Sequence, residues 1–156
     1  MNLVELGAAD LDRCLRHERR NFPSPWSEAS VKAELSGDAK HLALGLEQDG
    51  FLCAQVFARL VEDELHILNI SVEHAYRRKG LATELMSALF KRAAALSAES
   101  AFLEVRGSNT AAFALYEELG FTRIGLRKSY YADTGEDAVV MYCKLNKARK
   151  TLKTPR

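Results

Sequence analysis

The order of strand-like and helix-like segments is the feature that most limits how this chain can fold. Three strand-like runs follow one another, at residues 41–46, 51–61 and 65–72, and Asp49-Gly50 supplies a hairpin turn between the first two. The segment from Gly80 to Leu96 then places its apolar residues on one helical face. Hairpins interspersed with helices predict a mixed sheet that is covered on both faces.

The remaining segments complete this pattern. The other expected strands cover residues 2–6, 101–106, 121–127 and 138–145, and the other expected helices follow Asp10 or cover residues 28–35 and 109–119. Gly120 suits the left-handed position that ends a helix. The predicted fold is therefore α/β, with the order βααβββαβαββ, a mixed central sheet and helices on both of its faces.

Composition and charge indicate a single globular domain with a basic end. The chain has 156 residues, 47% of them hydrophobic, and a formal net charge of +1. Residues 144–156 hold six basic residues and no acidic one, which leaves 16 basic against 21 acidic residues in the rest. We expect one domain over residues 1–146 and a basic, flexible tail over residues 147–156. The acidic body favours a basic acceptor, and nucleic-acid binding is expected only through the tail.

The sequence pattern argues against a membrane-spanning protein, a secreted protein and a metal-binding protein. The apolar runs are too short to cross a membrane and the N-terminus lacks the pattern of a signal peptide, so a cytoplasmic protein is expected. Cys14, Cys53 and Cys143 are widely spaced and form no CxxC pair, which is typical of buried thiols. The histidines show no metal-binding spacing, and no metal site is predicted.

The segment Arg77-Arg78-Lys79-Gly80-Leu81-Ala82 lies between an expected strand and an expected helix. This segment resembles a cradle for phosphate groups. It combines small residues, the N–H groups of a helix start and the positive charges of Arg78 and Lys79. The segment matches neither the P-loop pattern nor the dinucleotide-binding pattern. On its own, it fits an ordinary basic helix start equally well.

Two further residues are candidates for acid–base chemistry. Glu104 lies inside an apolar strand, where partial burial would suit it to act as a base, although an outward-facing glutamate explains the position equally well. Tyr116 lies two helical turns after Asn109. It can be a core tyrosine or a phenol that donates a proton.

These segments taken together resemble a known family. Arg77-x-x-Gly80-x-Ala82 before a helix, with residues 103–112 and 115–121, resembles the GCN5-related N-acetyltransferases (GNAT) and, among them, the bacterial ribosomal-protein-alanine N-acetyltransferases. Residues 22–28, 69–72 and Tyr130-Tyr131 before 136–138 are similar to the same branch. The resemblance covers roughly residues 5–145.

The resemblance implies acetyl-CoA as a co-substrate. Its pyrophosphate would bind the helix start, and its pantetheine arm would pair with a strand and touch Asn109. The backbone N–H of Val72 would hold the thioester carbonyl. Ser71 stands where alanine is commoner and Ala82 where glycine is commoner. The implied coenzyme residues are Ile70, Ser71, Val72, Arg78, Lys79, Gly80, Leu81, Ala82, Thr83 and Asn109.

The resemblance also implies a direct transfer to an amine, with Glu104 as general base and Tyr116 as general acid. The acceptor peptide would contact Trp26, Tyr130 and Tyr131. Trp26 can instead be a packing anchor between the first two helices, and the tyrosines an ordinary strand-end pair.

The expected activity is acetylation of the α-amine of a protein N-terminus, in particular an alanine-starting ribosomal protein. Two alternatives are acetylation of a lysine or a small-molecule amine, and a non-catalytic acyl-CoA-binding module.

Overall fold

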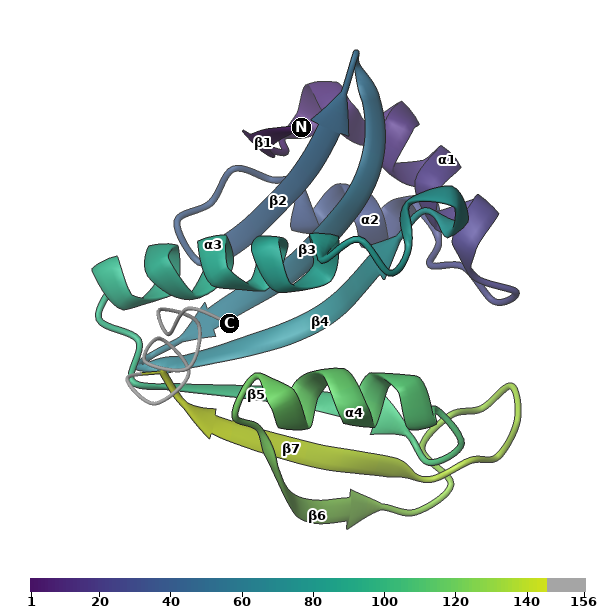
Figure 1. Ribbon diagram of the computed structural model, residues 1–156, viewed down its shortest axis with the longest axis vertical. Coiled ribbons are helices and arrows are strands. Elements are labelled where there is room, and N and C mark those ends of the chain that lie inside the picture. The colour runs from purple at the N-terminus through teal and green to yellow at the C-terminus, as the bar shows by residue number, and fades with distance from the viewer. Residues whose placement is uncertain (146–156) are drawn as a thin grey trace. The chain divides into compact units, whose positions relative to one another are not determined.

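The structure is a computed structural model that describes residues 1–145 (Figure 1). The strands are β1 (Asn2–Glu5), β2 (His41–Gln48), β3 (Phe51–Val61), β4 (Glu64–Val72), β5 (Ser100–Arg106), β6 (Thr122–Arg127) and β7 (Ala138–Lys144). The α-helices are α1 (Leu11–Asn21), α2 (Glu28–Glu34), α3 (Leu81–Ala95) and α4 (Thr110–Glu118), and two short 3-10 helices are η1 (Ala8–Asp10) and η2 (His74–Tyr76).

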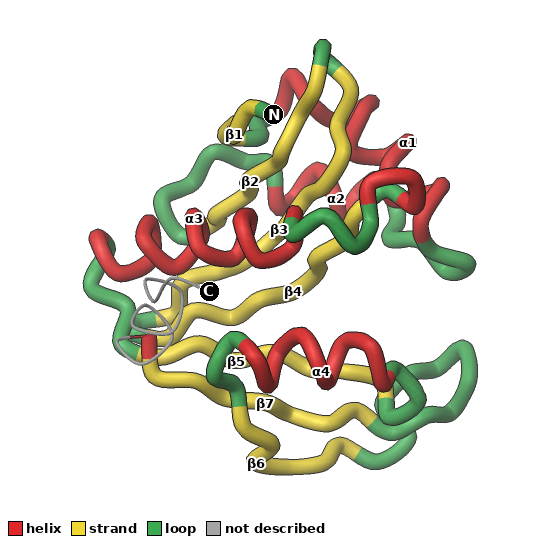
Figure 2. The backbone as a smooth tube through the Cα atoms, in the orientation of Figure 1, coloured by secondary structure: helices red, strands yellow, loops and turns green. Residues whose placement is uncertain are grey.

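The predicted α/β class and the predicted order of strands and α-helices are confirmed. The strands form a seven-stranded sheet in the order β1-β2-β3-β4-β5-β7-β6 (Figure 2). The pair β4–β5 is parallel, whereas β1–β2, β2–β3, β5–β7 and β6–β7 are antiparallel. The sheet is therefore mixed, as predicted. The Asp49-Gly50 turn has positive φ angles of 51° and 79°, which are typical of a two-residue hairpin turn.

The described chain divides into two compact units. The first consists of residues 1–60 and 68–89, and the second consists of residues 61–67 and the chain from Phe90 onward. Both β4 and α3 therefore begin in one unit and end in the other. The expectation of a single domain over residues 1–146 stays a prediction, and the predicted tail at 147–156 lies outside the described residues.

In the first unit, β2 and β3 are buried on both faces. Residues 42–46 and 52–58 are continuously buried, although side chains along a strand alternate between the two faces. Figure 1 shows α1 and α2 on one side of these strands and α3 on the other. One buried cluster joins α1, α2, β2 and β3 through Leu6, Cys14, Leu15, Val31, Leu35, Ala43, Leu52 and Phe57.

The N-terminus of α1 differs in one detail from expectation. Asp10 occupies the N-cap position, but its side chain does not cap the helix. Its carboxylate instead accepts hydrogen bonds from the Gly7 N–H at 2.8 Å and from Arg13 Nε at 2.9 Å. The preceding turn of η1 places Gly7 within reach, so the carboxylate stabilises the shorter helix.

In the second unit, β5 alternates between buried and half-buried residues. Ala101, Leu103 and Val105 are buried, and Glu104 lies on the opposite, half-buried side. Helix α4 begins at an Asn109 cap that accepts from the Ala112 N–H at 3.1 Å, and Gly120 follows it with φ 100°. The Asn109 cap and Gly120 therefore define the two ends of α4, the helix that carries Tyr116.

Other expectations concern the whole described chain. All three cysteines are buried thiols, as predicted. Within residues 1–145, no helix is long and apolar enough to span a membrane, and no group of three or more His, Cys, Asp or Glu side chains is arranged to hold a metal ion.

We expect Gly45→Ala to destabilise the protein by about 1–3 kcal/mol. A Cβ at this β2 position would lie 2.7 Å from Leu52 Cδ1 and 3.2 Å from the Ala54 carbonyl oxygen, inside the packed cluster. Gly125→Ala is a matched control, since its Cβ would meet Val140 Cβ at 3.9 Å on an exposed strand. Urea unfolding measures both. Equal stabilities for the two variants would show that the space around Gly45 adapts.

Candidate active site

The loop before α3 has the backbone of an anion-binding site. Arg78 and Gly80 adopt left-handed conformations, with φ of 63° and 79°. A Cβ at Gly80 would meet nothing within 4 Å, so the backbone there is open to a ligand. The first backbone hydrogen bond of the helix is donated by the Glu84 N–H to the Gly80 carbonyl. The N–H groups of residues 81–83 precede this bond, in the first turn of the helix.

The positive charge of this loop is exposed. Arg78 and Lys79 are both on the surface beside the start of a 15-residue helix, whose dipole also favours an anion there. The predicted phosphate-binding segment, residues 78–83, therefore has the charge and the backbone freedom that a pyrophosphate requires.

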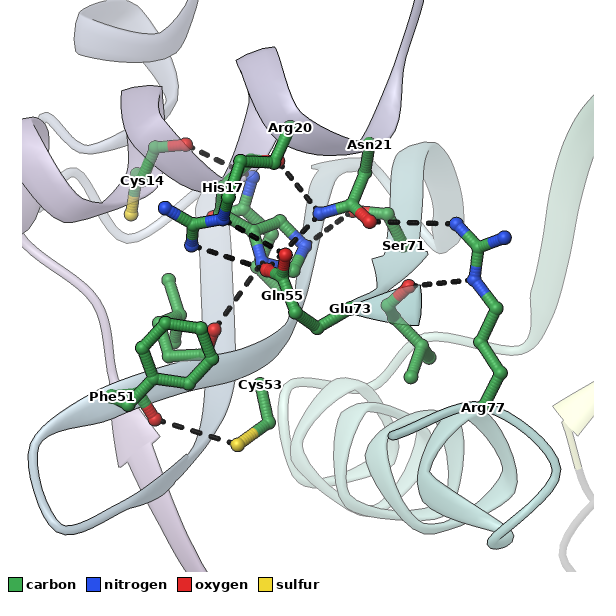
Figure 3. A network of polar contacts seen from close by, with 12 residues as sticks. Cys14, His17, Arg20, Asn21, Phe51, Cys53, Gln55, Ser71, Glu73 and Arg77 are labelled. Carbon is green, nitrogen blue, oxygen red and sulfur yellow. Dashed lines mark hydrogen bonds and ion pairs between the residues drawn. The ribbon is translucent and has the colours of Figure 1, made fainter. Parts of the chain in front are cut away.

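Arg77 has a different role. Its Nε donates to the Val72 carbonyl at 3.0 Å, and its second guanidinium nitrogen lies 3.4 Å from Asn21 Oδ1 (Figure 3). The side chain therefore joins the loop to the end of β4 and to α1. It fixes the carbonyl of Val72, whose N–H is the predicted donor to the thioester.

The end of β4 is held by a buried histidine that the sequence analysis did not single out. His17 is fully buried on α1, and its Nε2 lies 2.8 Å from Ser71 Oγ. Its Nδ1 lies 2.9 Å from Glu73 Oε2 and 3.4 Å from the Leu52 carbonyl oxygen. Figure 3 shows the side chains of His17 on α1, Ser71 near the end of β4 and Glu73 just after it close together.

The charges of this network are balanced around Glu73. Burial lowers the pKa of His17 despite the neighbouring Glu73 charge, which favours the neutral imidazole. Burial alone would raise the pKa of Glu73, but hydrogen bonds from Arg20 and Asn21 and the charge of Arg20 lower it. Arg20 contacts both carboxylate oxygens, at 2.8 and 3.1 Å. The ion pair is therefore Glu73 with Arg20.

The backbone of Trp26 is held by Glu18, a buried acid on α1. Glu18 Oε2 accepts from the Trp26 N–H at 2.9 Å, and Oε1 accepts from Asn69 Nδ2 at 3.1 Å. Burial raises the pKa of Glu18, although these hydrogen bonds oppose the shift. The Trp26 ring stacks on Phe57 of β3, with centroids 5.8 Å apart. The ring thus packs on the sheet, and its contact with an acceptor stays a prediction.

In the second unit, Glu104 is partly buried. Its side chain is 29% exposed, and its shielded Oε2 lies 3.3 Å from Arg127 Nε, without hydrogen-bond geometry. The strand register places Glu104 opposite Val140 of β7. Glu104 thus lies on the less buried face of β5 with one carboxylate oxygen shielded, and its role as a base stays a prediction.

Tyr116 is buried on α4. It packs edge-on against Phe121, with centroids 5.9 Å apart. Burial, with a smaller contribution from Tyr131, raises the pKa of its phenol to about 12. The hydroxyl is therefore protonated at neutral pH and available as a donor. The core position and the donor role are compatible.

Tyr130 and Tyr131 lie in the loop between β6 and β7, and polar contacts order this loop. Arg106 lies 4.0 Å from the centroid of the Tyr131 ring and contacts both Asp133 oxygens at 2.9 Å. Arg127 lies 5.4 Å from the Tyr130 centroid. Burial raises the pKa of Tyr131, and the charge of Glu104 adds to the shift. Within this unit, Tyr131 thus responds to the charge of Glu104 and itself contributes to the raised pKa of Tyr116.

The two units together contain every predicted site residue. Ile70, Ser71, Val72, residues 78–83 and Trp26 belong to the first, whereas Glu104, Asn109, Tyr116, Tyr130 and Tyr131 belong to the second. Sequence reasoning missed His17, Glu18, Arg106 and Arg127. A signal for Glu18 exists, because Leu11, Cys14, Leu15 and Glu18 share the apolar spacing of one helix face.

Comparison with known proteins places these features in a family. Residues 11–121 match the Acetyltransferase (GNAT) family. The chain is 37% identical over 144 residues to the [ribosomal protein bS18]-alanine N-acetyltransferase of Escherichia coli K12, covering 90% of this chain and 96% of that one. It is 34% identical over 137 residues to the putative enzyme of that name from Bacillus subtilis, covering 88% and 91%.

A solved structure agrees with the sequence comparison. The crystal structure of the ribosomal-protein-S18-alanine N-acetyltransferase from Escherichia coli matches with a TM-score of 0.85 and 34% identity, over 92% of this chain and 93% of that chain. The chain therefore belongs to the GNAT family, in the branch of the bacterial ribosomal-protein-alanine N-acetyltransferases, and is an acetyl-CoA-dependent N-acetyltransferase.

Proposed function

We propose that this protein acetylates the α-amine of an alanine-starting ribosomal protein in the cytoplasm, by direct transfer from acetyl-CoA. The observation that carries the proposal is the half-buried Glu104 carboxylate of β5, whose charge helps to raise the pKa of Tyr131 in the β6–β7 loop. The relatives from Escherichia coli and Bacillus subtilis, whose names specify the alanine of bS18, supply the acceptor.

The first unit binds the coenzyme. The backbone N–H groups of residues 81–83, with Arg78 and Lys79, hold the pyrophosphate. The backbone of Ile70, Ser71 and Val72 pairs with the pantetheine arm, which Asn109 also contacts. The Val72 N–H donates to the thioester carbonyl oxygen, where negative charge develops during the reaction.

The second unit supplies the acid–base groups. Glu104 accepts a proton from the acceptor ammonium, directly or through a water molecule, and the free amine attacks the thioester carbon. Because an α-amine has a pKa of about 7.7–8.0, a carboxylate base is sufficient near neutral pH. The Tyr116 hydroxyl donates to the sulfur as the carbon–sulfur bond breaks. Each group touches a reacting atom, and no covalent enzyme intermediate is required.

The acceptor is held by aromatic side chains. The backbone N–H of Trp26 donates to Glu18, and Arg106 lies over the ring of Tyr131. These contacts suit the first residues of an extended peptide. A lysine acceptor, with a pKa of about 10.4, would require a stronger base to release its proton. An α-amine is therefore favoured over a lysine side chain.

A panel of N-terminal peptides that differ only in residue 1 tests the function. We expect turnover with acetyl-CoA to be highest for the alanine-starting peptide and to be abolished when its α-amine is blocked. A peptide with a blocked N-terminus and an internal lysine is the matched control. Turnover of that control, or of a small amine in preference to the peptides, would contradict the proposed acceptor. Binding of coenzyme with no turnover of any amine would indicate a non-catalytic module.

We expect Glu104→Gln to lower kcat about 10²–10⁴-fold near neutral pH, because the amide cannot accept the ammonium proton. The loss should be smaller at about pH 9, where an α-amine is mostly neutral. Steady-state kinetics across this pH range measure the effect. Glu117→Gln is the control, since that exposed carboxylate on α4 pairs with Arg123. Equal turnover of the Glu104 variant and the native protein at every pH would remove Glu104 as base.

For Tyr116→Phe, we expect kcat to fall at least about tenfold while the Kd of CoA is kept, because only the hydroxyl donor is lost. The ring still packs against Phe121, so the unfolding free energy should change by less than about 1.5 kcal/mol. Titration calorimetry and urea unfolding accompany the kinetics. Tyr142→Phe is the control, because Tyr142 is a half-buried tyrosine on β7. A loss of stability with native turnover would leave Tyr116 as a core residue only.

A further inference from the structure

A buried chain of polar contacts connects the end of β4 to α1 and to Glu73, the residue after β4. It runs from Ser71 Oγ to His17 Nε2, 2.8 Å apart, and from His17 Nδ1 to Glu73 Oε2, 2.9 Å apart (Figure 3). Both neighbours of Nδ1, the Glu73 carboxylate and the Leu52 carbonyl, can only accept, so Nδ1 carries the proton. Neutral Nε2 is then the acceptor of the Ser71 hydroxyl proton.

The residues on either side of Ser71 are also fixed. Arg77 Nε donates to the Val72 carbonyl at 3.0 Å, and the Glu73 N–H donates to the Cys53 carbonyl at 2.7 Å. Arg20 and Asn21 hold the Glu73 carboxylate. The peptide unit between Ser71 and Val72, which includes the Val72 N–H, is therefore held by contacts on both sides.

We propose that His17 is a positioning residue for acetyl transfer, which acts through Ser71 to hold the Val72 N–H in place for the thioester carbonyl. This inference rests on the proposed use of Ile70–Val72 as the coenzyme strand. A fixed donor assists catalysis only where it meets the developing charge, and a displacement of about 1 Å can cost up to about 10²-fold in rate.

The order Ser–His–Glu also occurs in sites where the serine is a nucleophile. Here His17 is fully buried, Ser71 is 9% exposed and the charge of Glu73 is balanced by Arg20. These features suit a rigid support of the strand rather than attack by the Ser71 hydroxyl on the thioester.

The test is a double-mutant cycle of His17→Gln, Ser71→Ala and the double variant, with kcat, both KM values and unfolding free energy measured for each. We expect each single change to lower kcat about tenfold with the peptide KM unchanged, and the double variant to be no slower than the slower single variant. Ser71→Thr keeps the hydroxyl and should restore more than half of native kcat. Because Ser71→Ala removes only a hydroxyl, it carries the test should His17→Gln fail to fold.

His66→Gln is the matched control. His66 also pairs with a glutamate on β4, with its Nε2 3.0 Å from Glu64 Oε1, but both side chains are partly exposed. We expect native kinetics for this variant. Arg78→Ala tests the coenzyme site separately, through the Kd of CoA.

Three results would overturn the role of His17: additive losses of kcat in the cycle, a loss of unfolding free energy with native kcat and KM, or acetylation of Ser71 found by mass spectrometry during turnover. If Arg78→Ala leaves the Kd of CoA unchanged, the proposed coenzyme site fails whatever the cycle shows. If Arg78→Ala weakens binding while His17→Gln and Ser71→Ala keep native kcat, the positioning role alone fails.

Discussion

Two consecutive residues of α1, His17 and Glu18, place ionisable groups in the interior and direct them at the second half of β4. Burying such groups is unfavourable unless each one is hydrogen-bonded, so their partners determine how the helix can lie. His17 forms a hydrogen bond with Ser71 and lies 2.9 Å from the Glu73 carboxylate, whereas Glu18 accepts hydrogen bonds from Asn69 and from the backbone of Trp26. A rotation or shift of α1 would break both sets at once. The helix therefore fixes the proposed coenzyme strand and the Trp26 segment together.

The β6–β7 loop is held by weaker interactions. Arg106, Asp133, Thr134 and Glu136 form its polar contacts, and most of these are exposed. Exposed ion pairs contribute only about 0–1 kcal/mol each. These side-chain contacts therefore stabilise the loop that carries Tyr130 and Tyr131 less than the buried contacts stabilise the end of β4. This difference suits the proposed function, in which the end of β4 binds the coenzyme without rearranging and the β6–β7 loop contacts a peptide that enters and leaves.

The fold could be predicted from local patterns because most of its elements are signalled by short stretches. The Asp49-Gly50 turn, the Asn109 cap and Gly120 all act on neighbours within a few residues. The polar contacts of the site could not be predicted in the same way. His17 meets Ser71 across 54 residues, and Arg106 meets Asp133 across 27. Such pairs depend on how helices and strands pack, which no spacing within one element reveals.

The prediction of Glu104 is limited in the same way, because its contacts come from other strands. Its place in an alternating strand indicates which side it faces, but its partner Arg127 comes from a different strand, β6. Its position inside an apolar strand names Glu104 as a candidate base but leaves an outward-facing glutamate equally possible. Its partial shielding became visible only with β6 and β7 in place, since these strands bring Arg127 and the tyrosine loop beside it.

The raised pKa of Tyr116 sharpens what this residue can contribute. A phenol with a pKa of about 12 keeps its proton at neutral pH, so the donor form is always present. Moving that proton to a thiolate with an ordinary pKa of about 8.5 is uphill by about 3–4 units, or about 5 kcal/mol. Donation of a hydrogen bond carries no such cost and still stabilises charge on the leaving sulfur. Under the proposed mechanism, Tyr116 would therefore lower the barrier mainly as a fixed hydrogen-bond donor to the leaving sulfur, and not by complete proton transfer.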